Sequence, residues 1–221
     1  LTGAGALMAG ALAKPALVRA ASATTLRFVP YADLALLDPI ITTNYVTRTH
    51  ALMIFDTLYS LDTAYRAQPQ MVAGHEVASD GLTWRLTLRD GLRFHDGTPV
   101  LGRDVVASLK RWAQRDAYGG ALFATVDELT APTDTVVQFR LKRPFPLLPD
   151  ALAKPTSYVP VIMPERLSAT PATQPVPEMV GSGPFRFAAD ERVPGSLNVY
   201  RRFEAYRPRA DGTPSFTAGP R

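Results

Sequence analysis

The chain has 221 residues, of which 46% are hydrophobic and 20% charged, a composition typical of a globular chain that can bury a core and form two subdomains. Its formal net charge of +4 falls to +2 once Lys14 and Arg19 are left out, too little to indicate a nucleic-acid partner. The absence of cysteine excludes thiol catalysis, disulfide bonds and cysteine-bound zinc.

The first 23 residues differ from the rest in composition. They are rich in alanine, leucine and glycine, carry no acidic residue, and end in the small-x-small triplet Ala21-Ser22-Ala23. The apolar run of residues 1–12 is too short to span a bilayer. We expect a secretory signal peptide that is cleaved after this triplet, so that the mature chain starts at Thr24 outside the cytoplasm. An amphipathic structural helix is the alternative interpretation.

The mature chain is expected to begin with a short strand followed by a helix. Residues 25–29 are the strand candidate, which breaks at Pro30. Between Asn44 and Tyr59, apolar and aromatic residues return at near-helical spacing, and the Asn44 side chain can cap the first turn. The pattern predicts a helix over this segment that packs on one face.

Three later segments predict strands. Residues 83–89 alternate strictly between apolar and polar side chains, and residues 135–142 repeat the pattern. Residues 185–200 predict a hairpin, because Pro194-Gly195 lies between two alternating runs. The inward-facing residues of the first two strands are Trp84, Leu86, Leu88, Val137, Phe139 and Leu141. Together with the amphipathic helices, these strands favour a mixed α/β fold with antiparallel pairs.

The stretch LRDGLRFHDGTPV, residues 88–100, places a histidine between two Asp-Gly turn signals. His95 raises the questions of a catalytic pair and of a metal site, but His50, His75 and His95 are scattered and none forms a His-x-x-x-His pair. We therefore expect no metal site. We expect His95 to face solvent or to bond locally, His95→Ala to be nearly neutral, and Gly97→Val to be destabilising.

A helix is predicted after Pro99. Its first turn contains Asp104, which is expected to serve the helix N-terminus. The residues of its apolar stripe are Val105, Val106, Leu109, Trp112 and Ala113. This stripe is expected to pack in the core.

The segment DGLTWRLTLRDGLRFHDGTPVLGRDVVASLKRW, residues 80–112, closely resembles the signature of the extracellular solute-binding proteins of family 5, the peptide, nickel and oligopeptide receptors of ABC importers. Further landmarks agree in order and spacing: LDPI, IFDTLYSLD, an Arg-Pro-Phe after a strand, GSGPFRF and YRP. The likeness covers about residues 25–208. Leu101 and Arg103 depart from the family's capping and acidic residues, and Arg207 replaces a common Trp.

The resemblance implies a periplasmic-binding-protein-like α/β fold with a mixed sheet and a type II-like lobe, of which this chain holds only the N-terminal part. The expected segments are a signal peptide at 1–23, the start of lobe I at 24–59, an accessory subdomain at 60–160, a return into lobe I at 161–208, and an irregular tail at 209–221 with the second lobe missing.

The function implied is that of a non-catalytic receptor, periplasmic or extracellular and monomeric. It would bind a peptide or a similar small polar solute, without a cofactor, and deliver it to the permease subunits of an ABC importer. The candidate ligand-binding residues are Tyr31, Asp33, Tyr158, Ser182 and Gly183. For the tyrosines the alternative is packing at the surface, and for Gly183 it is close approach of another backbone segment.

Two other classes of function remain as alternatives. A scaffold or non-binding module of the same fold would show no ligand-dependent stabilisation. A hydrolase would need a nucleophile with a base, but GSGP lacks the Gly-x-Ser-x-Gly pattern and no histidine has a local partner. We therefore assign no catalytic residue.

Overall fold

The computed structural model describes residues 24–209, so that the expected signal peptide and most of the expected tail lie outside the described residues. Residues 24–30 belong to one unit and residues 31–209 to another. The strand expected at 25–29 is not formed. A strand needs neighbouring N–H and C=O groups, and no described residue offers a backbone hydrogen bond to this segment, whose Leu26 and Val29 are exposed.

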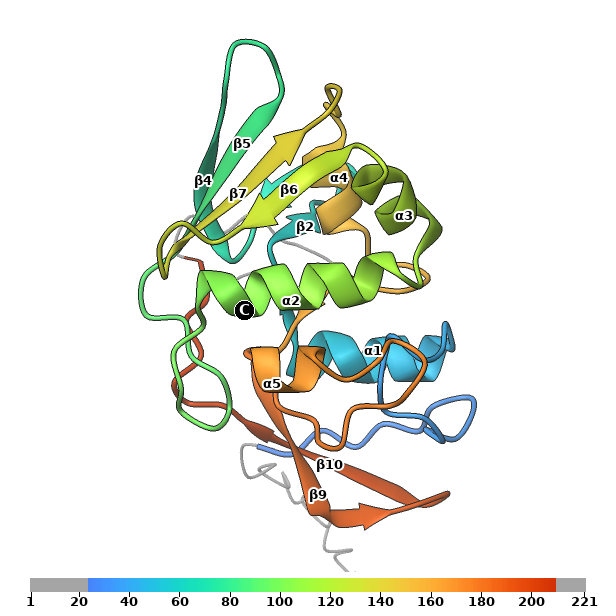
Figure 1. Cartoon of the computed structure of the whole chain (residues 1–221). Coiled ribbons are helices and arrows are strands. Elements are labelled where there is room, and N and C mark those ends of the chain that lie inside the picture. The colour runs from blue at the N-terminus through green and yellow to red at the C-terminus, as the bar shows by residue number, and fades with distance from the viewer. Residues whose placement is uncertain (1–23, 210–221) are drawn as a thin grey trace, which may run out of the picture. The chain divides into compact units, whose positions relative to one another are not determined.

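The second unit contains the helices and strands that the structure describes (Figure 1). The helices are α1 (Tyr45–Ile54), α2 (Gly102–Ala113), α3 (Ala117–Phe123), α4 (Leu148–Ala153) and α5 (Glu165–Ser168). The strands are β1 (Asp56–Thr57), β2 (Tyr59–Leu61), β3 (Ala67–Pro69), β4 (Val72–Val77), β5 (Thr83–Leu88), β6 (Val126–Thr130), β7 (Val136–Leu141), β8 (Val161–Ile162), β9 (Phe185–Val193) and β10 (Leu197–Arg202). The mixed α/β prediction is confirmed.

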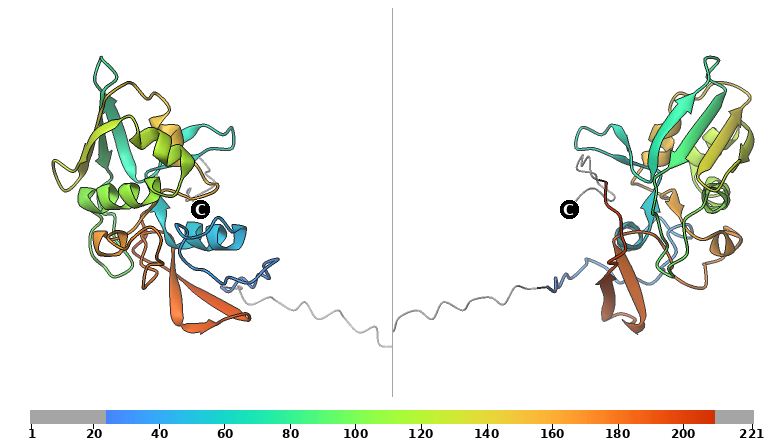
Figure 2. Two further views of the ribbon diagram at one scale, coloured as in Figure 1. Left: turned by 45° about the vertical axis from the view of Figure 1, so that its right-hand side comes forward. Right: turned by 90° about the vertical axis from the view of Figure 1, so that its left-hand side faces the viewer.

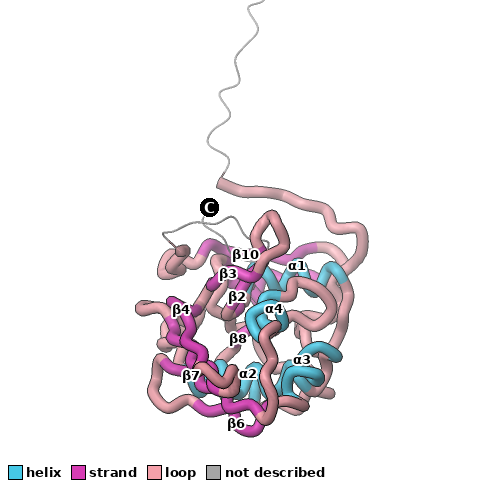
Figure 3. Tube along the Cα trace, turned by 90° about the horizontal axis from the view of Figure 1, so that it is seen from above, coloured by secondary structure: helices cyan, strands magenta, loops and turns pink. Residues whose placement is uncertain are grey.

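A four-stranded antiparallel sheet in the order β4-β5-β7-β6 covers one side of the larger core (Figure 2). Trp84 lies opposite Phe139 and Leu86 opposite Val137, so the predicted inward residues meet across β5 and β7. Helices α2, α3 and α4 lie on one face of this sheet (Figure 3). On the other face Arg85 is exposed. Strict alternation therefore reflects one buried and one solvated face.

Helix α2 is the central helix of the larger core. Its predicted stripe is buried at Val105, Leu109 and Trp112. Asp104 serves the helix start as expected, because one carboxylate oxygen accepts a hydrogen bond from the Leu101 N–H at 2.8 Å. The other oxygen accepts from the Glu165 N–H, so that the same side chain also positions α5.

Helix α1 is shorter than predicted. It ends at Ile54, the backbone of Phe55 is extended, and the apolar residues that continue the pattern lie in β2 and its approach. Leu58 and Tyr59 are buried there among residues of the larger core. Asn44 stands before the helix but its side chain makes no capping bond. Beyond Ile54, buried residues on both sides of the extended chain give an apolar spacing that resembles that of a helix.

A smaller hydrophobic cluster lies around α1, β8 and the β9–β10 hairpin. It includes Ile54, Val161, Leu167 and Phe187. The hairpin was predicted correctly, and its turn contains Gly195 at φ 77°, a conformation that glycine adopts without strain. Among the described residues, no helix has the length and apolar composition needed to cross a membrane.

Candidate functional site

The first candidate residues stand on the segment before α1. Tyr31 is 76% exposed, and its ring centroid lies 6.1 Å from that of Tyr45, which is 57% exposed in the first turn of α1. Asp33 is exposed as well, and none of the described residues forms an ion pair with it. These side chains are free to contact a ligand.

Buried polar contacts hold this segment in place. The Asp38 carboxylate accepts hydrogen bonds from the backbone N–H of Ile40 and of Val176 and pairs with the Arg111 guanidinium at 2.8 Å. The side chains of Asp38 and Arg111 are 1% and 2% exposed. Upstream of Asp38, the Leu36 carbonyl accepts a hydrogen bond from the Thr47 hydroxyl. Buried contacts of the same segment therefore support the exposed residues.

Tyr158 lies on a different support, the loop between α4 and β8. Its carbonyl oxygen accepts a hydrogen bond from the Trp112 indole at 2.8 Å, which joins the loop to α2. The Arg115 guanidinium lies 5.5 Å from the Tyr158 ring centroid and donates to its hydroxyl at 3.3 Å. Tyr158 is half-buried.

The GSGP loop packs against the end of α1. The Gly183 N–H donates to the Ile54 carbonyl at 2.7 Å, and the Gly183 carbonyl accepts from the His95 ring at 3.0 Å. A Cβ at Gly181 or Gly183 would lie less than 3 Å from atoms of Ile54. The Ser182 hydroxyl is buried without a partner among the described residues. Close approach of two backbone segments thus explains both glycines.

His95 is neither solvent-facing nor bonded only to its own turn, so the expectation for this residue is wrong. It is 5% exposed, and its ring contacts Phe203 edge to face at 4.9 Å. Its Nε2–H donates to the Gly183 carbonyl, while Nδ1 accepts from the Gly181 N–H at 3.4 Å. The two Asp-Gly turns form as predicted, with φ 75° at Gly91 and 89° at Gly97, and they place His95 against the GSGP loop.

We accordingly expect His95→Ala to destabilise the protein by about 2 to 3 kcal/mol, because the change leaves buried backbone groups of the GSGP loop unbonded and opens a cavity. The free energy of urea unfolding measures this loss. Arg93→Ala is the control from the same turn, since the exposed Arg93 side chain donates to the Gly97 carbonyl of that turn. Equal losses in the two variants would contradict the bridging role of His95.

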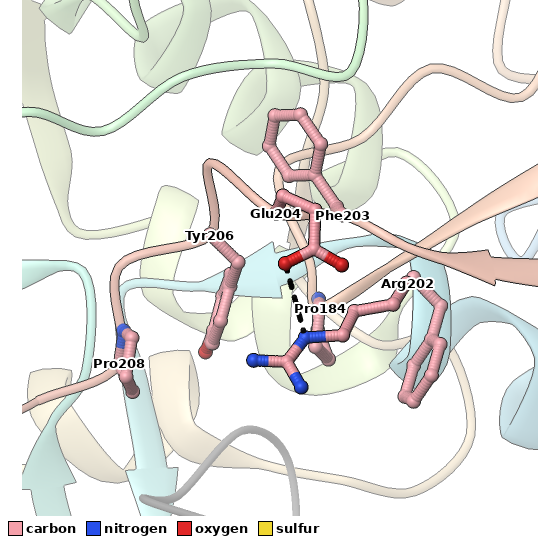
Figure 4. A pocket seen from close by; sticks show the side chains of 7 residues that line it. Pro184, Arg202, Phe203, Glu204, Tyr206 and Pro208 are labelled. Carbon is pink, nitrogen blue, oxygen red and sulfur yellow. Dashed lines mark ion pairs between the residues drawn. The ribbon is translucent and has the colours of Figure 1, made fainter. Parts of the chain in front are cut away.

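No hydrogen bond, ion pair or ring contact of the described residues joins Tyr31, Tyr158 and Ser182 to one another. A pocket of the described residues lies elsewhere, at the end of β10 (Figure 4). Its volume is about 190 Å³, below the 300–1,000 Å³ of most small-molecule sites. Its lining residues are Pro184, Phe185, Arg202, Phe203, Glu204, Tyr206 and Pro208. Of the candidates, Tyr31 and Asp33 are exposed, Tyr158 is half-buried, and Ser182 and Gly183 are buried. None of them lines this pocket.

Within residues 24–209, no group of three or more histidine and acidic side chains is arranged to hold a metal ion.

The sequence model of the bacterial extracellular solute-binding proteins, family 5 Middle, matches residues 66–217. The chain belongs to this family. The match extends over the four-stranded sheet, α2 and the hairpin, so the resemblance inferred from residues 80–112 is confirmed.

Relatives in family 5 are longer than this chain. The probable peptide ABC transporter periplasmic-binding protein y4tO of Sinorhizobium fredii is 39% identical over 98% of this chain, and the chain spans 41% of its length. The glutathione-binding protein GsiB of Pectobacterium atrosepticum is 29% identical over 69% of the chain. The part of GsiB that matches this chain is 30% of the length of GsiB. The chain therefore spans less than half the length of either relative.

Solved structures of family 5 relatives share the fold. AgaA of Agrobacterium tumefaciens R10, in complex with agropinic acid, has 31% identity and a TM-score of 0.64, covering 78% of this chain and 34% of AgaA. AppA of Bacillus subtilis, in complex with a nonapeptide, has 20% identity and a TM-score of 0.66, covering 80% of this chain and 36% of AppA. The fold is therefore part of a longer periplasmic-binding-protein-like fold, as predicted.

Sequence reasoning missed a buried histidine beside the hairpin. The His50 ring accepts or donates through Nδ1 at 2.7 Å from the Tyr200 hydroxyl, and it packs edge to face on Phe187. Burial, assisted by the charge of Arg192, lowers the pKa of His50 to about 3. Burial likewise lowers the pKa of His95 to about 4. Spacing alone could have placed His50 on the inner side of α1, but not beside Tyr200.

These two histidines predict a loss of stability in acid. Because their pKa values are lower in the folded chain, the unfolded chain binds more protons as the pH falls below 6.5. Burial raises the pKa of Asp56 to about 6, which opposes this loss. We expect the free energy of urea unfolding to fall by about 2 kcal/mol between pH 7 and pH 5. In Asp56→Asn the fall should be larger, and a flat profile in both proteins would contradict the prediction.

Proposed function

We propose that this chain forms part of the solute-binding receptor of an ABC-type importer. The observation that carries the proposal is the 39% identity to y4tO, a probable peptide ABC transporter periplasmic-binding protein, over 98% of the chain. The importer permease would be its membrane partner, and the periplasm or the cell exterior its location. Since the chain spans 41% of y4tO, we propose that it supplies one wall of the ligand-binding cleft.

The proposed ligand is a peptide or a similarly small polar solute with a carboxylate. Ligands named with the relatives include a nonapeptide, glutathione and agropinic acid, and a carboxylate is common to these classes. In the proposed wall, Tyr31 and Tyr158 offer aromatic surface and Asp33 offers a charge for a ligand amine. Ser182 and Gly183 rank behind them, because the backbone groups of Gly183 are already bonded.

We propose further that the receptor is monomeric, binds no nucleic acid, uses no cofactor and catalyses no reaction. Membership in a family of solute-binding proteins supports a binding role. We also keep the division into segments 24–59, 60–160 and 161–208 as part of the proposal. The sheet and the helices α2 to α4 come from 60–160, and the smaller cluster lies mainly outside that range.

A tripeptide titration tests the proposal. A mixed tripeptide pool is added to the ¹⁵N-labelled 221-residue chain, and amide chemical shifts are followed to millimolar concentration. We expect saturable shifts near Tyr31 or Tyr158 with a Kd of about 1 mM, because one wall cannot enclose a charged ligand terminus. AppA, solved with a nonapeptide, is the positive control for peptide binding.

The outcomes separate the competing functions. Absence of any shift at millimolar peptide would overturn the binding proposal and favour a scaffold of the same fold. Micromolar affinity would overturn the one-wall proposal, since this chain would then hold a complete site. Time-dependent cleavage of the peptides would instead indicate a hydrolase.

A further inference from the structure

Two exposed tyrosines and a half-buried arginine lie together at the surface, a group that sequence reasoning did not assemble. The Arg48 guanidinium carbon lies 4.7 Å from the centroid of the Tyr45 ring, and the Tyr45 ring lies 6.1 Å from that of Tyr31. We call Tyr31, Tyr45 and Arg48 the tyrosine-arginine patch. Its two rings are 76% and 57% exposed. Large aromatic side chains with this exposure present apolar surface to solvent without a covering segment among the described residues.

The charge of Arg48 is not neutralised by the described part of the chain. No carboxylate of residues 24–209 lies within ion-pair distance of Arg48, and its side chain donates no hydrogen bond to a described residue. Arg111, by contrast, is fully buried and paired with Asp38. Arg48, which is half-buried, therefore has no acidic partner within the described residues.

We propose that the tyrosine-arginine patch receives a carboxylate of the ligand, an inference that rests on the proposed receptor function. A guanidinium presents a planar set of N–H donors that matches the two oxygens of a carboxylate. The cation-π contact with Tyr45 restricts the guanidinium before the ligand arrives, which lowers the entropic cost of binding. Tyr31 then offers its ring to the carbon atoms next to the carboxylate.

This assignment makes the patch a specificity-determining surface. Asp33, two residues after Tyr31, carries the opposite charge on the same segment. A ligand with both a carboxylate and an amine would therefore meet complementary charges at Arg48 and Asp33. A solute without charged groups would leave both side chains unpaired. The patch thus favours zwitterionic solutes, such as short peptides with free ends, over solutes without charged groups.

The test compares two probes that differ only at the carboxylate: trialanine and trialanine amide. Each is titrated into the ¹⁵N-labelled 221-residue chain at pH 7 and low salt. In the wild-type chain, trialanine should shift the amide resonances of Tyr45 and Arg48 and bind about five- to tenfold more tightly than its amide. In Arg48→Gln this preference should disappear.

Arg85→Gln is the matched control, since exposed Arg85 on β5 bonds Gln138 and carries the same charge. It should retain the preference for the acid. An equal preference in Arg48→Gln and the wild type, or shifts confined to Tyr158, would overturn the patch assignment while leaving the receptor function standing. Absence of binding by either probe would overturn both. Equal shifts with inorganic phosphate would overturn the assignment to a carboxylate.

Discussion

Gly181→Ala is expected to prevent stable folding or to lower the free energy of unfolding by about 4 kcal/mol or more. A Cβ at this position would lie 2.7 Å from the Phe55 ring and closer still to the Ile54 carbonyl oxygen. Neither neighbour can yield easily, because Phe55 is 1% exposed and the Ile54 carbonyl is hydrogen-bonded to Gly183. Overpacking of a buried position is one of the mechanisms behind the largest losses caused by single substitutions.

Gly74→Ala is the matched control. No atom lies within 4 Å of a Cβ built at Gly74, and its φ is not positive, so the free energy of unfolding should change by less than about 1 kcal/mol. Urea unfolding followed by circular dichroism measures both variants. Similar stability of the two proteins would show that the GSGP loop can move away from α1.

Asp38→Ala is expected to cost about 3 to 5 kcal/mol, because it leaves the buried Arg111 guanidinium without its carboxylate. The two side chains are 2% exposed or less. The change also removes the acceptor of the Ile40 and Val176 N–H groups. Loss of the carboxylate should therefore loosen the segment that carries Tyr31 as well as destabilise the core.

Asp127→Ala provides the comparison at the surface. Asp127 pairs with Arg140 at 2.9 Å, but both side chains are about half exposed. Such pairs contribute about 1 kcal/mol or less, because water and salt screen them. Urea unfolding of the two variants, with amide spectra of the Tyr31 segment, measures both effects. A small loss in Asp38→Ala, comparable to that in Asp127→Ala, would show that Arg111 finds another partner.

Asp38→Ala and Gly181→Ala bear on the candidate site, because each changes a segment that supports candidate residues and not a residue expected to contact the ligand. Asp38 holds the segment of Tyr31 and Asp33, and the GSGP loop ties the end of α1 to His95. We expect ligand binding to weaken in either variant only to the extent that these supports move. If either variant is stable and binds the ligand with unchanged affinity, the ligand would instead contact the loop around Tyr158.

Much of the fold could be predicted from local patterns. The alternation in 83–89 and 135–142 predicted β5 and β7 with the correct inward faces, because one face of the sheet is buried and the other solvated. Pro194-Gly195 predicted the turn between β9 and β10, and the apolar stripe predicted α2. In each case the information lies within a few residues.

The errors arose where distant segments decide. Leu58 and Tyr59 continue the helical spacing of α1, yet they lie in or beside β2 because both sides of the chain are buried there. Residues 25–29 have the composition of a strand but no pairing partner among the described residues. Nothing near Asn44 indicates that its side chain would leave the helix start uncapped.

The sequence by itself determined the family, the mixed α/β class, the antiparallel strand pairs and the turns at Gly91, Gly97 and Gly195, since these depend on side-chain period and backbone preference. Only the tertiary structure decided that His95 is buried and bonded to a loop 88 residues away, and that Tyr45 and Arg48 lie beside Tyr31. The physical reason is that burial and charge pairing depend on which distant segments meet, and a single sequence does not state those contacts.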